Sequence, residues 1–226
     1  MDNDYIIGID EVGRGPIAGP VAVGAFGLQI KNYELIIKNA KEQLKLPIRD
    51  SKKLTKKQRE KWFEYLKKEK EKGSCDFAVT LVSAEWIDKV GIVRAIQKAL
   101  NQSLEKVASS EILFSRSSDK GGRRARPSKK EFPTSLSVFL DGGLKAPEEF
   151  VNQQTIIKGD ETRPIISLAS IVAKVSRDRV MCKYADQYPA YGFEKHVGYG
   201  TRAHYRAIRL YGRTPIHRQS FFTLAS

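Results

Sequence analysis

Two adjacent carboxylates, Asp10 and Glu11, stand directly after a short apolar run near the start of the sequence. The run, Tyr5–Ile9, has the length and composition of a buried strand. Successive side chains of a strand point to opposite faces, so this strand would carry one carboxylate on each side of its end. A buried carboxylate is costly unless a cation or another partner compensates its charge. The pair therefore fits either a solvated turn or a cation site, and the spacing alone leaves both open.

A turn of unusual composition, Gly13-Arg14-Gly15, follows the two acids. Glycine permits a positive φ or the close approach of another molecule to the backbone. Arginine is suited to binding phosphate. The two acids could bind a metal, the glycines leave the backbone open to a ligand, and Arg14 could bind a phosphate. This combination favours a site that cleaves nucleic acid.

Two later apolar runs are also followed by acids. Leu136–Leu140 precedes Asp141, and the short run Thr155–Ile157 precedes Asp160. A single Asp-Gly is more often a turn signal than a site. Ligands of α/β sheets, however, bind at the carboxyl ends of the strands. Three predicted strands that end in carboxylates therefore indicate one shared site.

The charge of the protein points to a polyanionic partner. The chain has 226 residues, enough for one domain with a sizeable core, and a formal net charge of +14. Such a charge favours association with nucleic acid, although a basic protein without such a partner stays open.

The remaining composition indicates a cytoplasmic protein without membrane contact. Cys75 and Cys182 show neither metal-ligand spacing nor a disulfide framework, so we expect free thiols in a reducing compartment. The acidic start Met1–Asp4 does not resemble a signal peptide, and no apolar run approaches membrane length.

The spacing of apolar residues places the other elements. The second apolar run, Val21–Phe26, follows the first closely and predicts an antiparallel partner strand. Residues 31–48 predict a loop with a short helical piece. Apolar periodicity and capping residues predict a strand at Asp76–Val82, a helix after Thr55, a short helix after Ser83, and helices at Ile92–Val107, Ile165–Tyr184 and Arg202–Leu210. Small residues in the helix from Ile165 predict close packing across the sheet.

Three polar features carry weaker predictions. Residues 115–130 hold seven basic residues and one acid, and we interpret 115–134 as a basic flexible insertion with auxiliary affinity for nucleic acid. Asp178 is expected to pair with neighbouring arginines. The histidines share no metal-ligand spacing, so we expect packing or phosphate contacts from His196, His204 and His217.

Several ordered motifs together resemble type 2 ribonuclease H in its bacterial form, over residues 5–222 apart from the basic insertion. They are Asp10–Pro16 with Ala18–Pro20, Asp50–Leu54, Asp141-Gly142, Lys158–Asp160, Ala169–Arg179, Gly198–Thr201 and Thr214–Arg218. Gly200 stands where the family commonly has proline, a departure that bears on the pose of Tyr199.

The resemblance implies an α/β, RNase H-like fold. This is a mixed five-stranded sheet flanked by helices, with a C-terminal helical segment at about 188–226, all in one catalytic domain, 1–226. It also implies that Asp10, Glu11, Asp141 and Asp160 bind two divalent ions, Mg²⁺ or Mn²⁺. Such a pair activates a water and stabilises the leaving oxygen in an in-line hydrolysis that yields a 3′-hydroxyl and a 5′-phosphate.

The resemblance also assigns substrate contacts. The backbone of Gly13-Arg14-Gly15 would contact the 2′-hydroxyl, which distinguishes RNA from DNA. Tyr199 would stack on the sugar of the following deoxynucleotide and bond to the same hydroxyl; without the motif it would be read as a core aromatic. Lys52, Lys53 and Lys174 are candidates for phosphate contacts.

The implied activity is a monomeric endoribonuclease that cuts the RNA strand of RNA/DNA hybrids and cleaves 5′ of single ribonucleotides in duplex DNA. One alternative is a type 3 preference for longer RNA tracts, although that type usually has an extra N-terminal domain and here the first strand begins at Tyr5. A branched-DNA resolvase and a non-catalytic hybrid-binding protein are the others. The sequence does not reveal a sliding-clamp or polymerase partner.

Overall fold

The computed structural model describes residues 5–46, 53–110 and 135–222. The predictions for Lys52 and for the insertion at 115–134 lie outside these residues. Within the described parts of the chain, no helix is long and apolar enough to cross a membrane.

A mixed five-stranded sheet forms the centre of the molecule, as the resemblance implied, with the strand order β3-β2-β1-β4-β5. β1 pairs antiparallel with β2 and parallel with β4, while β2–β3 is antiparallel and β4–β5 is parallel. The strands are β1 Tyr5–Val12, β2 Val21–Gln29, β3 Asp76–Val82, β4 Leu136–Asp141 and β5 Gln153–Ile156. The parallel pair β1–β4 places the carboxyl ends of both strands at the same edge of the sheet.

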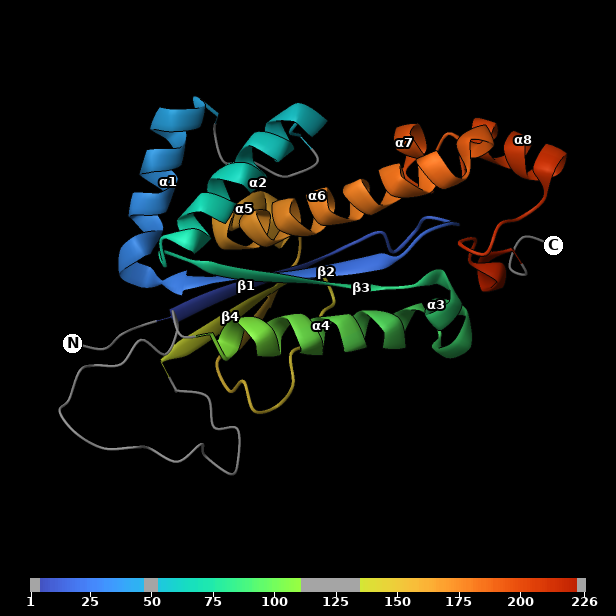
Figure 1. Ribbon diagram of the computed structural model, residues 1–226. Coiled ribbons are helices and arrows are strands. Elements are labelled where there is room, and N and C mark those ends of the chain that lie inside the picture. The colour runs from blue at the N-terminus through green and yellow to red at the C-terminus, as the bar shows by residue number, and fades with distance from the viewer. Residues whose placement is uncertain (1–4, 47–52, 111–134, 223–226) are drawn as a thin grey trace.

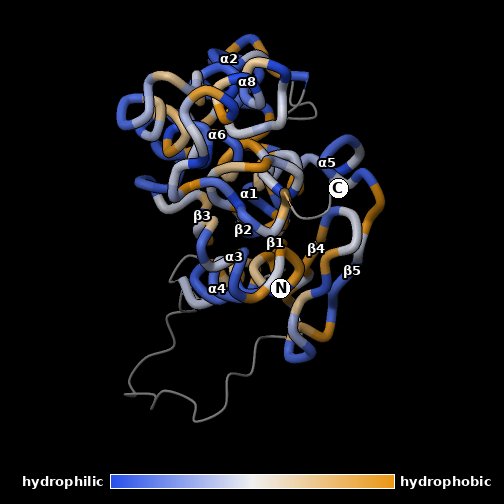
Figure 2. Tube along the Cα trace, turned by 90° about the vertical axis from the view of Figure 1, so that its right-hand side faces the viewer, coloured by the Kyte–Doolittle hydropathy of each residue, from blue (hydrophilic) through white to orange (hydrophobic). Residues whose placement is uncertain are grey.

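Helices cover both faces of this sheet (Figure 1). They are α1 Ile30–Leu44, α2 Lys56–Glu71, α3 Ala84–Val90, α4 Ile92–Ala108, α5 Gly159–Thr162, α6 Pro164–Gln187, α7 Phe193–His196 and α8 Arg202–Tyr211, with 3₁₀ turns η1 Pro189–Tyr191 and η2 Gln219–Phe221. Figure 2 shows α2 and α6 on one side of the sheet and α3 and α4 on the other, with β5 at one edge and β3 at the opposite edge.

Two apolar cores fill the spaces between the sheet and these helices. Ile7 and Ile9 of β1 belong to the core shared with α4, whereas Ile6 belongs to the core shared with α6. Gly8 and Gly24 let α6 approach closely, since an added Cβ would collide with the backbone carbonyls of Ile165 and Ala169 respectively. This confirms the predicted close packing of the long helix.

Capping and strand predictions agree with the structure in most places. The Thr55 hydroxyl accepts a hydrogen bond from the Gln58 N–H, and the Gln58 side chain accepts one from the Thr55 N–H, which completes a capping box at α2. Ser83 caps α3 in the predicted way. Cys75 and Cys182 are both free thiols.

Three predictions about local structure are wrong. Of the predicted loop at 31–48, the described residues 31–46 are mostly the helix α1, whose buried side chains Ile36 and Ala40 repeat at helical spacing within a highly charged sequence. The fifth strand ends at Ile156, and Ile157 is 83% exposed beyond it. Asp160 therefore lies in the short helix α5 and not at a strand end.

A third apolar cluster forms where α7 and α8 pack against the far end of α6. It contains Met181, Tyr191, Phe193 and Ala207, together with Ala18 from the segment between β1 and β2. The C-terminal helical segment is thereby joined to the segment that follows Asp10 and Glu11.

Candidate active site

The strand register brings the predicted acids together. Ile9 of β1 lies opposite Leu140 of β4 in the parallel pair, so the next residues, Asp10 and Asp141, follow side by side where that pairing ends. One carboxylate oxygen from each of Asp10, Glu11 and Asp141 lies within 4.8 Å of the others. The structure thus gathers three of the four predicted acids into one cluster.

Burial and mutual repulsion make this cluster electrostatically unfavourable without a cation. Asp10 is only 4% exposed, and burial raises its pKa well above the ordinary value. A hydrogen bond from Ser170 opposes that shift, whereas the negative charges of Asp141, Glu11 and Asp160 add to it. Burial also raises the pKa of Glu11, against the attraction of Arg14, whose guanidinium lies 3.6 Å from the Glu11 carboxylate.

Asp160 lies beside the cluster. Its side chain is 1% exposed, and its charge raises the pKa of Asp10, although its oxygens are not part of the group within 4.8 Å. The Gly159 N–H donates a 2.6 Å hydrogen bond to Asp141 Oδ1, and the preceding Lys158 adopts a left-handed φ of 54°. The turn into α5 therefore orients Asp141 and places Asp160 next to it.

The donor set fits a hard divalent cation. Asp10, Glu11 and Asp141 offer only carboxylate oxygens, the ligands that Mg²⁺ and Mn²⁺ prefer. A bound cation would offset the like charges that raise the pKa of Asp10.

The Gly13-Arg14-Gly15 turn is held from behind by an arginine far along the chain. Arg218 donates hydrogen bonds to the carbonyls of Gly13 at 2.7 Å and Arg14 at 3.0 Å. In a trans peptide the N–H points away from the C=O, so the N–H groups of Arg14 and Gly15 point away from Arg218. Gly13 has a φ of 88°, and an added Cβ would collide with the side chain of Arg177.

Arg177 and Arg218 are the positioning residues that sequence reasoning missed. Both are 0% exposed. Arg177 donates to the carbonyls of Pro20 at 2.8 Å and Val197 at 2.9 Å, and Arg218 also donates to Gly19 at 2.9 Å. Both arginines lie within the motifs quoted above, but their acceptors are backbone carbonyls, which leave no pattern of side-chain types in a sequence.

Tyr199 lies next to this turn. Its side chain is 45% exposed, so it is not a core aromatic. The Tyr199 ring is 4.0 Å from the position that a Cβ on Gly15 would occupy. The structure therefore brings the turn and Tyr199 together, close along the chain to Asp10 and Glu11.

The two described candidate lysines are both paired with acids. Lys53 lies 3.7 Å from Glu161, the neighbour of Asp160, and Lys174 donates a 2.9 Å hydrogen bond to Asp178. The predicted pairing of Asp178 with arginines is confirmed for Arg59 of α2, whereas its sequence neighbour Arg177 donates to backbone carbonyls and Arg179 donates to Glu60 and Glu64. Residues four apart on a helix share a face, so Asp178 meets Lys174, and Arg59 of α2 lies 4.0 Å away.

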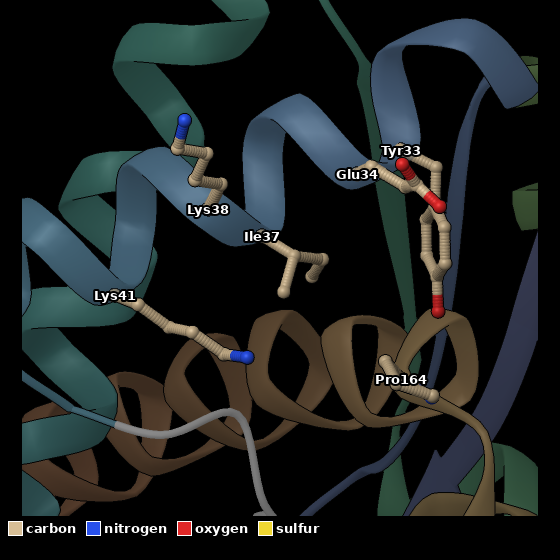
Figure 3. Close-up of a pocket in the computed structure, with 6 residues that line it drawn as sticks. All are labelled: Tyr33, Glu34, Ile37, Lys38, Lys41 and Pro164. Carbon is tan, nitrogen blue, oxygen red and sulfur yellow. The ribbon is translucent and has the colours of Figure 1, made fainter.

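Two surface cavities of the described part of the chain lie away from the acid cluster. One cavity of about 300 Å³ lies between α1 and the start of α6, where the side chains of Tyr33 and Ile37 point toward α6 (Figure 3). Another lies between α1 and α2. None of the described candidate site residues lines either of these two cavities.

A mixed sheet of this strand order, with a carboxylate cluster at the ends of its parallel strands β1 and β4, defines a metal-dependent nuclease with an RNase H-like fold. The sequence model of the ribonuclease HII family matches residues 7–224, and the chain belongs to that family. Proteins of this family are metal-dependent endoribonucleases, and ribonuclease H activity on RNA/DNA hybrids follows for this chain.

The similarity extends over nearly the full length of the relatives. Ribonuclease HII of Endomicrobium trichonymphae is 38% identical over 216 residues, which cover 96% of this chain and 84% of the relative. Ribonuclease HII of Coxiella burnetii is 39% identical over 220 residues, 97% of this chain and 89% of the relative. The crystal structure of ribonuclease H2 from Pyrococcus horikoshii superposes with a TM-score of 0.62 at 26% identity, covering 96% of this chain and 93% of the other.

Proposed function

We propose that this ribonuclease H cuts 5′ of single ribonucleotides embedded in duplex DNA, besides cutting the RNA strand of hybrids. One observation carries the proposal. The Gly13-Arg14-Gly15 turn and the Tyr199 ring lie together, and the turn begins two residues after Glu11. This proximity supports ribose recognition by the turn and Tyr199 next to the acids proposed to act on the phosphodiester.

The proposed metal ligands are Asp10, Glu11, Asp141 and Asp160, for two Mg²⁺ or Mn²⁺ ions. Such ions lower the pKa of a bound water and stabilise the charge of the leaving oxygen. Of the protein groups, Asp10 and Asp141 are held by the adjacent strands β1 and β4, and the Gly159 N–H fixes the orientation of Asp141. The burial of Asp10 keeps water from screening its charge.

Recognition of the ribose is assigned to the backbone of the turn. The N–H groups of Arg14 and Gly15 point away from the carbonyls that Arg218 binds, so they are free of that contact and suited to a 2′-hydroxyl oxygen. The exposed Tyr199 ring offers an apolar face for the following sugar. Lys53 and Lys174 would exchange their carboxylate partners for phosphates, and Lys52 is the third candidate.

The proposal also treats the protein as a cytoplasmic monomer with one catalytic domain, 1–226. Light scattering on the purified protein, with and without a ribonucleotide-containing duplex, measures the oligomeric state directly. We expect the free protein to have the mass of one chain and the complex to have the mass of one chain and one duplex.

The decisive experiment uses a DNA duplex that contains one ribonucleotide, incubated with the protein and Mg²⁺ or Mn²⁺, with the cut mapped to the nucleotide. We expect one cut on the 5′ side of the ribonucleotide, leaving a 3′-hydroxyl. An all-DNA duplex of the same sequence and the Asp141→Asn variant are the controls, and both should give no product.

Other outcomes would replace the proposal by a specific rival. Cleavage only within longer RNA tracts would indicate the type 3 preference. Cleavage of branched DNA without any ribose would indicate a resolvase. Binding without cleavage in either metal would indicate a hybrid-binding protein.

A further inference from the structure

Two buried histidines that the proposed chemistry does not use form a hydrogen-bonded pair behind Tyr199. His204 of α8 is 0% exposed and His217 is 1% exposed. Their Nε2 atoms lie 3.0 Å apart. Two ring nitrogens at this distance share one proton, so the other contacts of each ring determine which ring donates.

The surrounding contacts determine which histidine donates the hydrogen bond within this pair. The Tyr199 carbonyl, 2.9 Å from His204 Nδ1, can only accept, so His204 Nδ1 has a proton and the neutral ring accepts at Nε2 from His217 Nε2–H. His217 Nδ1 then has no proton and accepts from the Thr214 N–H at 2.9 Å, a shorter contact than its 3.3 Å approach to the Thr214 carbonyl.

Both rings are neutral in this arrangement, and their surroundings support that state. Burial lowers the pKa of His204 to about 4 and also lowers the pKa of His217. His196, which stacks on His204 at a centroid distance of 4.3 Å, and Arg213 are the nearby groups whose charges lower these pKa values further. A proton added to either ring would place two N–H groups face to face.

The carbonyl at the end of this chain belongs to a segment that is restrained on both sides. Before Tyr199, the Gly198 carbonyl accepts hydrogen bonds from the N–H groups of Ile17 at 3.0 Å and Ala18 at 3.2 Å. Val197 has a φ of 44°, a strained conformation for a β-branched residue, and its carbonyl accepts from Arg177. After Tyr199, the Thr201 N–H and His204 bind the Tyr199 carbonyl.

The ring of Tyr199 itself has no comparable restraint, since it is 45% exposed and faces the open side of Gly15. Its position therefore depends on its backbone. We propose that His217 and His204 are positioning residues, which fix the Tyr199 backbone so that the ring faces the Gly13-Arg14-Gly15 turn. The proposal rests on the proposed role of Tyr199 in substrate recognition.

Matched amide substitutions separate this role from simple packing. In His204→Asn the amide nitrogen replaces Nδ1, so the donor to Tyr199 is kept and the contact with His217 is lost. In His204→Gln the amide replaces Nε2, so the contact with His217 is kept and the donor to Tyr199 is lost. Each variant gives up one hydrogen bond of the same buried side chain, so thermal melts should show similar losses of stability.

The expected result is an asymmetry in kcat/KM on the duplex with one ribonucleotide. His204→Asn should keep a kcat/KM within about threefold of the wild type, whereas His204→Gln should lose at least tenfold in kcat/KM. A tenfold loss is what the removal of one hydrogen bond that helps to position the transition state would cause. In a Tyr199→Ala background, His204→Gln should have no further effect, because the group that it positions is absent.

Three results would overturn the inference. Equal losses in both histidine variants would assign His204 to packing alone. Full activity of a folded His204→Gln variant would show that Tyr199 needs no such donor. A His204→Gln loss that persists beside Tyr199→Ala would place its effect elsewhere.

Failure of the proposed function would appear in the wild type itself and not in the comparison of the two histidine variants. If the wild type leaves the single ribonucleotide intact, the same variants are compared on an RNA/DNA hybrid, where the wild type is active. The asymmetry there still tests the two histidines.

Discussion

Asp10→Asn is expected to stabilise the protein in the absence of divalent ions while it abolishes cleavage. The Asp10 side chain is 4% exposed and lies within 4.8 Å of the carboxylates of Glu11 and Asp141. Asparagine has nearly the same shape and can still bond to Ser170, but it removes one of the like charges. The substitution therefore relieves a repulsion that the folded protein otherwise contains.

The size of the effect follows from the distances. At an effective dielectric constant of about 20, two unit charges 4.8 Å apart repel by about 3 kcal/mol. Arg14 offsets part of this repulsion at Glu11, and solvent screens the partly exposed Glu11 and Asp141. We therefore expect a gain of about 1–3 kcal/mol in the free energy of unfolding, with about 2–4 °C in Tm for each kcal/mol.

The assay is thermal unfolding with EDTA and then across a Mg²⁺ titration, in parallel with cleavage of an RNA/DNA hybrid. The wild type gains stability as it binds metal, and Asp10→Asn should gain much less, so the two Tm curves cross. Cleavage should fall at least about a hundredfold, in line with the loss of a metal ligand. Glu148→Gln, which removes an exposed carboxylate, is the matched control and should leave Tm and cleavage unchanged.

A variant that melts below the wild type in EDTA would refute the account of the cluster as mutually repelling charges. A variant that gains as much from Mg²⁺ as the wild type would refute Asp10 as a metal ligand.

Three further predictions concern the elements around the site. Gly24→Ala should lower the free energy of unfolding in a denaturant titration by about 1–3 kcal/mol, because the added Cβ would lie 2.5 Å from the Ala169 carbonyl oxygen. Gly143→Ala is the control and should be nearly neutral, because its added Cβ would meet nothing within 4 Å. Arg218→Lys should reduce kcat/KM on the single-ribonucleotide duplex at least tenfold while Mg²⁺ still raises Tm, since lysine cannot serve three carbonyls in a fixed fork; unchanged kinetics would contradict the role of Arg218. Burial lowers the pKa of His204 to about 4 from an ordinary 6.5, so as the pH falls the histidine is protonated in the unfolded chain before it is protonated in the folded protein. The contribution of His204 to the free energy of unfolding is therefore full above pH 6.5 and falls by at most about 3 kcal/mol as the pH drops to 4. His204→Asn should show a shallower decline over the same pH series, and an equal decline would assign the loss to other groups.

The positions of Asp10 and Asp141 were predictable because both acids follow a recognisable local pattern. Asp10 and Asp141 end apolar runs that form strands, and the structure confirms both runs. Asp160 was expected at a strand end, but it follows a turn through Lys158 in a left-handed conformation, which no apolar pattern encodes. The helix α1 was missed because its few apolar residues are diluted by charged ones.

The arginine hydrogen bonds that hold the Gly13-Arg14-Gly15 turn and the segment after it were not predictable from local patterns. Arg218 binds the carbonyls of Gly13 and Arg14, more than two hundred residues earlier in the chain, and Arg177 reaches Pro20 across 157 positions. A hydrogen bond to a backbone carbonyl constrains no side chain at the acceptor. The sequence therefore reveals the acids, whose proposed role depends on their own side chains, but not the arginines, whose hydrogen bonds go to the backbone of distant residues.

The link between Arg218 and the Gly13-Arg14 turn also sets an order for synthesis. A nascent polypeptide can pair β1 with β2, β4 and β5 and assemble its acids well before residue 218 has been translated. The turn acquires its support only when the last segment docks, as a late, long-range closure of the kind that slows folding. If the turn recognises the ribose as proposed, a product that ends before Arg218 would have the acids of the cluster but not the hydrogen bonds that hold the turn, so selectivity would be acquired after the acids are assembled.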